Sequence, residues 1–361
     1  EAIKNVDVTG YARYRFDSRD NNNAGTKNAH RFTSDVNFKS ALDDNFFGVL
    51  GFRYDSVDAS GERTGAETMV GTFDDGNDSF GQTFNVRQVY LGYTAGNTTI
   101  TAGRQVLGTF FTDDMVGTGI KLLNSDISGL TLAAIAFDNL QDDGDIGTSD
   151  LLLGSKDIAN AEYVYDRNLY GVAAIGSYDP VSFQLWYAAL DSVAQLYAAD
   201  VTVGANIGNV DLSLQAQVAG SSMWADNAGV EVGVDNNGNA IVSTLPLDDA
   251  TFWAAELGAK AFGFDGSVGY VQFDTDEISL ISFEDQGSFI DAGEDLLNYT
   301  AFAGDNKYWF VTAGYTFADK VRVGADYVAG EGSDGVLVRD VDRYEAVARV
   351  DYKYSKKLNF K

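Results

Sequence analysis

Charged side chains recur at every second position of several short segments, a spacing that could line one charged surface. The basic residues with this spacing are Arg13, Arg15, Arg31, Lys39, Arg53, Arg322, Arg343 and Arg349. A row of such side chains creates a field that attracts and orients ions. The pair Asp113-Asp114 lies in a segment without any base, residues 105–116, and could supply the opposing charge.

Composition excludes several other kinds of site. The chain has no cysteine, which removes disulfides, thiolate metal sites and cysteine nucleophiles. Its single histidine, His30, argues against Ser-His-Asp catalysis and against zinc sites built from several histidines. A formal charge of −28 argues against nucleic acid as a partner. The stretch GEGSDG (330–335) matches a nucleotide-binding glycine pattern, but no helix pattern follows it.

The elements that must position these charges follow a period of two. Over residues 6–17, Val6, Val8 and Tyr14 share one parity, whereas the charged residues share the other. This alternation predicts strands with one apolar and one charged face. It recurs over 31–42, 210–218, 321–329 and 343–354. Arg87 and Arg104 share the parity of their apolar neighbours, so we expect a β-bulge there or a position beyond the apolar band.

Short turns and long polar loops connect the predicted strands. We expect tight turns at 43–45, 95–97, 124–128, 179–180, 206–209, 262–265, 318–320 and 355–357. The long loops, which we expect to be external, are 58–81, 139–167, 220–249 and 275–305. Aromatic residues such as Phe46, Phe262 and Phe317 gather beside the short turns, which is typical of a girdle at a membrane interface.

These patterns predict an all-β fold: a single large antiparallel transmembrane β-barrel over residues 1–361, with about 16 strands readable in the sequence. The alternative is a soluble β-sandwich. The apolar faces mix Ala, Gly, Val, Leu, Phe and Tyr, as lipid tolerates, and the opposite faces carry charges at strand centres. A sheet in lipid must close because its edge amides have no partner there, and a barrel of this size encloses water.

Five stretches resemble a known family. RQVYLGYTAGNTTITAGRQ (87–105) resembles a paired-strand segment of Gram-negative porins, and VLGTFFTDDMVGTGIKLLNSDISGLTLAA (106–134) follows where such porins place a loop that folds into the lumen. With EAIKNVDVTGYARYRFD at the start, YGVAAIGSYDPVSFQLWYAAL (170–190) and ISLISFEDQGSF (278–289), the chain resembles the major outer membrane protein porins of Campylobacter and related epsilonproteobacteria.

The resemblance implies a homotrimer of 18-stranded barrels in the outer membrane of a Gram-negative bacterium, in contact with lipid and lipopolysaccharide. It implies an inward constriction loop at about 105–116 and a bound calcium ion, for which Asp113, Asp114, Asp138 and Glu284 are the candidate ligands. Such porins finish on a full strand. Because this chain stops at Lys361, we expect either a further strand pair or closure at 16 strands.

Barrel closure would bring the early and late basic residues, with Arg87 and Arg104, into one wall facing Asp113 and Asp114. This arrangement predicts a transverse field at the constriction. The alternative is that the arginines pair locally with acids such as Asp35, Glu345 and Asp351.

The sequence therefore predicts a passive, non-enzymatic channel for ions and small hydrophilic solutes. Residues 105–319 carry a net charge of −27, which favours weak cation selectivity. A channel specific for a sugar, phosphate or another anion is the alternative within the same class; a surface adhesin and an outer-membrane enzyme are more distant ones.

Overall fold

The computed structural model describes residues 6–21, 25–56, 84–141, 145–148, 151–153, 162–234, 240–277, 288–294, 296–297, 304–333 and 340–361. The chain divides into two compact units. Unit 1 comprises residues 1–106 and 116–122, and unit 2 comprises residues 107–115 and 123–361. Within the described ranges, no helix is long and apolar enough to cross a membrane.

Unit 1 is an antiparallel array in which each strand from β1 to β5 pairs with the next along the chain. Its strands are β1 (Val6–Asn21), β2 (Gly25–Ala41), β3 (Phe46–Ser56), β4 (Phe84–Ala95), β5 (Thr98–Val106) and most of β6 (Val116–Asn124). Tight connections at 42–45 and 96–97 join β2 to β3 and β4 to β5, as the sequence predicts.

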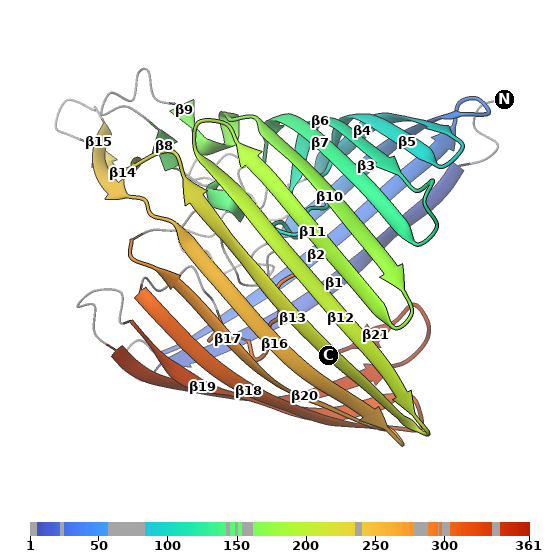
Figure 1. Cartoon of the computed structure of the whole chain (residues 1–361), viewed down its shortest axis with the longest axis vertical. Helices are drawn as coiled ribbons and strands as arrows, with labels where there is room; N and C mark the ends of the chain where they lie inside the picture. The colour runs from blue at the N-terminus through green and yellow to red at the C-terminus, as the bar shows by residue number, and fades with distance from the viewer. Residues whose placement is uncertain are drawn as a thin grey trace. The chain divides into compact units, whose positions relative to one another are not determined.

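Unit 2 continues the same pattern with long antiparallel strands that run side by side (Figure 1). They are β7 (Leu130–Leu140), β10 (Leu169–Tyr178), β11 (Val181–Leu190), β12 (Ala194–Ile207), β13 (Val210–Met223), β16 (Ala250–Ala261), β17 (Phe264–Thr275), β18 (Gly304–Phe317), β19 (Val321–Ser333), β20 (Asp340–Lys353) and β21 (Asn359–Phe360). Each pairs with its neighbour in this order. Two- to five-residue connections at 179–180, 208–209, 262–263, 318–320 and 354–358 confirm the predicted turns.

A small second sheet in unit 2 lies within segments that the sequence predicts to be loops. Its order is β15 (Ala240–Pro246), β14 (Asn227–Val234), β8 (Leu151–Leu153) and β9 (Glu162–Tyr163). Short 3₁₀ turns at Asp145–Gly147 and Val164–Asp166 accompany it. The loops predicted at 139–167 and 220–249 are therefore partly ordered strand, and the loop at 58–81 lies outside the described residues.

The strands expose their large apolar side chains, the reverse of a soluble protein. On β20, Tyr344 and Val350 are 75% and 60% exposed, whereas Glu345 and Arg349 on the other face are partly buried. On β2, Phe38 is exposed and Asp35 is buried. The predicted faces are thus confirmed in both units, and the exposed face belongs in an apolar solvent.

The parity conflict at Arg87 is resolved by a β-bulge. Gly51 pairs with Gln88, but the next residue of β3, Phe52, pairs with Val86, so Arg87 is skipped in the ladder. The extra residue turns Arg87 to the buried face while Val86 and Val89 stay about half exposed. Of the two explanations that the sequence leaves open for Arg87, the structure shows the bulge.

Candidate functional site

Two segments of unit 2 pack against the charged-face side of its strands, and we call them the covering segments. The first is residues 107–115, between β5 and β6. Leu107, Phe110, Phe111 and Met115 are each at most 1% exposed and belong to the apolar cluster of unit 2. The backbone N–H of Leu107 donates to the carbonyl of Met115, 2.9 Å away, which closes the base of the loop.

The second covering segment comprises the described residues 288–294 and 296–297. Its Phe289 ring packs edge-on against Phe110 of the first segment and Phe252 of β16, with centroids 4.8 and 5.0 Å apart. The N–H of Ser288 also donates to the carbonyl of Phe110 at 3.0 Å. The sequence predicts an external loop over 275–305, and this part of it contacts Phe110 and Phe252. Apolar residues such as Phe289 and Ile290, which are unusual in a long polar loop, are the sequence signal that could have predicted this contact.

The buried side-chain amide of Gln217 on β13 binds the backbone of the second covering segment, as a neighbouring strand would. Gln217 accepts a hydrogen bond from the N–H of Ile290 and donates to the carbonyl of Ser288, both at 2.7 Å. Its amide nitrogen also donates to Asp200, which Gln215 contacts as well, both at 2.6 Å. Gln217 is 2% exposed, so its polar atoms need these partners.

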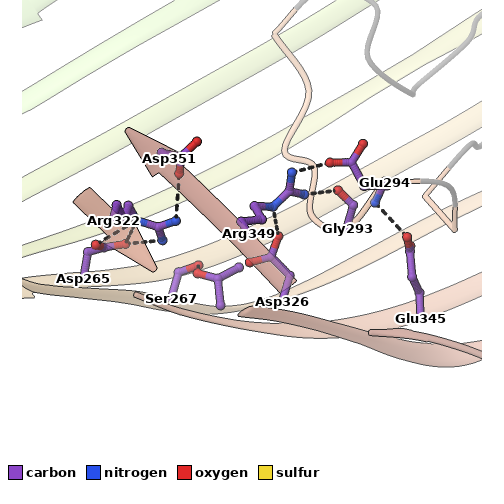
Figure 2. A network of polar contacts seen from close by, with 10 residues as sticks. Asp265, Ser267, Gly293, Glu294, Arg322, Asp326, Glu345, Arg349 and Asp351 are labelled. Atoms are coloured by element: carbon purple, nitrogen blue, oxygen red, sulfur yellow. Dashed lines mark hydrogen bonds and ion pairs between the residues drawn. The ribbon is translucent and has the colours of Figure 1, made fainter. Parts of the chain in front are cut away.

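Charged groups on β20 hold the other end of the second covering segment. The Glu345 carboxylate accepts from the N–H groups of Glu294 (2.9 Å) and Leu296 (3.0 Å). Arg349 donates to Glu294 and to the carbonyl of Gly293, and its Nε donates to Asp326 at 2.8 Å (Figure 2). Gly293 has a φ of +85°, and a Cβ there would lie 2.5 Å from Glu345 Oε2, so only glycine fits.

Farther along the same face, Arg322 links three strands. Its guanidinium makes a two-pronged contact with Asp265 on β17, the shortest at 2.6 Å, and approaches Asp351 on β20 at 3.7 Å (Figure 2). The side chain crosses Gly314 of β18, where a Cβ would overlap the guanidinium. The missing side chain at 314 is what lets Arg322 reach Asp265.

The remaining predicted basic residues have different surroundings. In unit 1, buried Arg87 pairs with buried Asp35 at 3.1 Å, Arg15 pairs with Asp17 at 2.7 Å, and the Lys39 ammonium lies 4.1 Å from the Phe47 ring centroid. In unit 2, Arg343 donates to Tyr308 Oη (3.2 Å) and to the Ser333 carbonyl (2.6 Å).

Arg13 is exposed, Arg53 and Arg104 are partly buried, and the Arg31 side chain lies outside the described part of the chain. Arg15, Arg87, Arg322 and Arg349 each pair with a carboxylate, as the local-pairing alternative expects.

The candidate calcium ligands are not brought together in the part of the chain described. Asp113 is exposed and Asp114 partly so at the tip of the first covering segment, and Asp138 lies on the exposed face of β7, opposite buried Phe137. Glu284 lies outside the described residues. Among those that are described, no three acidic or histidine side chains gather as a metal site would require. Calcium binding stays a prediction from the resemblance.

Long antiparallel strands with a lipid-compatible exposed face and a charged opposite face define an outer-membrane β-barrel protein. The whole chain, residues 1–361, matches the family described as Campylobacter major outer membrane protein. The chain belongs to that family and is a multi-pass protein of the outer membrane of a Gram-negative bacterium. No curated protein matches it in sequence.

Solved porin structures share this fold at low identity. Pseudomonas aeruginosa OccK9 (OpdG) superposes with a TM-score of 0.71 at 16% identity, covering 97% of this chain and 89% of its own. Acinetobacter baumannii OccAB3 gives 0.70 at 12%, covering 97% and 89%. A BenF-like porin of Pseudomonas fluorescens Pf-5 gives 0.68 at 15%, covering 99% and 92%. These likenesses establish the fold.

Proposed function

We propose that the protein is a passive, water-filled channel through which ions and small hydrophilic solutes cross the outer membrane. The observation that carries this proposal is that the strands expose their apolar side chains and carry charge on the opposite face. Arg322, Asp265 and Asp351 lie on that charged face, opposite the exposed aromatic residues. Charged side chains at the middle of a bilayer need water or charged partners. If the strands close into a barrel, the charged face borders enclosed water and the opposing charged side chains. Passage is diffusion and needs no catalytic residue.

The outward face then meets lipid and lipopolysaccharide, and the exposed aromatics beside the turns lie at the interface. The trimer and the count of 18 strands implied by the family resemblance belong to the same proposal. Trimeric assembly predicts that current appears in steps grouped in threes.

The channel prefers cations weakly. Three of the basic side chains on the charged face, Arg87, Arg322 and Arg349, already contact carboxylates, which compensates much of their charge. The chain as a whole carries −28. Fixed negative charge around a narrow passage raises the local concentration of counter-ions. Asp113 and Asp114, exposed or partly exposed, add to that field.

Reconstitution into planar bilayers tests both the channel activity and the cation selectivity. The proposal expects stepwise ohmic conductance in KCl and, across a KCl gradient, a reversal potential on the cation-selective side. Folded protein that inserts without conducting would refute the channel. A reversal potential on the anion side would refute the selectivity while leaving the channel intact.

A further inference from the structure

A polar hollow of about 540 Å³ lies on the charged face of β12, β13, β16, β17 and β18. The cross-strand register explains its shape. Ser213, Gly258, Ser267 and Thr312 stand opposite one another on successive strands. Because Gly258 has no side chain, this row forms a low floor, and the hydroxyls of Ser267 and Thr312 satisfy each other at 2.7 Å.

The rows on either side of the floor carry charge. Gln215 and Glu256 are register partners on one side, and Asp211 and Lys260 on the other. Asp211 accepts a hydrogen bond from Asn206, at 2.5 Å, and Asp265 is engaged by Arg322. Figure 2 shows the contact between Asp265 and that arginine, and both Asp265 and Ser267 line the hollow.

Glu256 differs from these neighbours. It is partly buried on the wall of the hollow, yet within the described structure it makes no hydrogen bond or ion pair. Gln215, its register partner, donates to Asp200 instead. A partly desolvated carboxylate without a partner gains most from a ligand that brings a positive charge and N–H donors.

From this geometry we infer that the hollow is a binding subsite for solutes carrying an ammonium group, with Glu256 as the carboxylate that receives it. The hydroxyls and the Gln215 amide offer further hydrogen bonds to a small polar body. The lining contains no aromatic side chain, which disfavours a sugar that would stack there. Lys260 repels the ammonium from the opposite side and so directs it to Glu256. The inference rests on the proposed channel and assigns it one solute class.

Current block by 1,5-diaminopentane in planar bilayers tests the subsite. In KCl, the wild-type channel is expected to show brief, concentration-dependent interruptions. Glu256→Gln is expected to shorten their lifetime about tenfold, the size of one charge-assisted hydrogen bond. The matched control is Glu331→Gln, which removes the same charge from the exposed face of β19 and is expected to leave the block unchanged.

Lys260→Gln is a second test because it removes the positive charge that lines the same hollow as Glu256. A longer block in Lys260→Gln supports the inference; a shorter one overturns it, since Lys260 would then be holding the solute. An unchanged block in Glu256→Gln also overturns it. A wild-type channel that conducts but shows no block leaves the channel standing and refutes the subsite, whereas absence of conductance in every variant refutes the channel itself.

Discussion

The charged face of unit 2 has two halves that differ in chemistry, and β16 shows the change within a single strand. Toward one end, Phe252 and Ala254 are each 2% exposed and lie in the apolar cluster beneath the covering segments. Two residues farther along the same face, Glu256 begins a polar half that continues through Gly258 to Lys260. On β17 the same change runs from buried Phe273 and Val271 to Ser267 and Asp265.

The two halves show that alternation assigns a residue to a face, while the covering structure sets the chemistry of that face. Apolar side chains on the charged face need a protein cover, and the covering segments 107–115, 288–294 and 296–297 supply it. The polar half needs water instead. On β16 the exposed face stays apolar through Trp253, Leu257 and Ala259, as contact with lipid requires.

Removing the cover is expected to have the largest effect. Phe289→Ala takes away the ring that packs against Phe110 and Phe252, and deletion of a buried aromatic costs about 3–5 kcal/mol. The second covering segment should detach, raising single-channel conductance and opening the segment to protease. Phe262→Ala, at a turn and 74% exposed, is the control. If Phe289→Ala leaves both the conductance and the resistance of the segment to protease unchanged, Phe289 does not hold the segment on the strands.

Releasing the charged end of the same segment is expected to have a smaller effect. Arg349→Met removes the contacts to Glu294, Gly293 and Asp326 but keeps the hydrophobic packing, for a loss of about 1–2 kcal/mol. Protease cleavage within 288–297 should become faster than in wild type and stay slower than in Phe289→Ala. The reverse order would place the main attachment at β20 instead of at the apolar cluster.

In the polar half, Gly314→Val tests the crossing of Arg322. The new side chain would occupy the path of the guanidinium and break its contact with Asp265, at a cost of about 1 kcal/mol for a pair whose side chains are 27% and 24% exposed. Freed positive charge should shift the reversal potential toward anions by a few millivolts. The control is Gly204→Ala on β12, where a Cβ would meet only the Pro180 carbonyl oxygen at 3.9 Å. No shift would mean that Arg322 finds another carboxylate.

The smallest effect is expected from the tip of the first covering segment. Asp113→Asn combined with Asp114→Asn removes two negative charges without touching the buried Phe110 and Phe111. Cation selectivity should fall slightly while conductance is retained. If the reversal potential does not move, these carboxylates do not face the ion path, and the constriction assigned to 105–116 is wrong.

Much of this fold could be predicted from the sequence because period-two patterning reports local backbone geometry. The strands, the tight turns and the bulge at Arg87 all follow from neighbours a few residues apart. The attachment of 288–297 could not be predicted, since it depends on Gln217, Glu345 and Arg349 meeting a segment distant in sequence. The basic residues were identified, but the pairing of Arg322 with Asp265 depends on the empty position at Gly314.

The central claim is that the charged face borders water and the exposed face borders lipid, and β16 offers its most direct test. The chain has no cysteine, so single cysteines can be placed at residues 256, 257, 258 and 259 in turn. A charged, membrane-impermeant thiol reagent should reduce the current of Glu256→Cys and Gly258→Cys and leave Leu257→Cys and Ala259→Cys unaffected. Reaction at 257 and 259 but not at 256 and 258 would contradict the account.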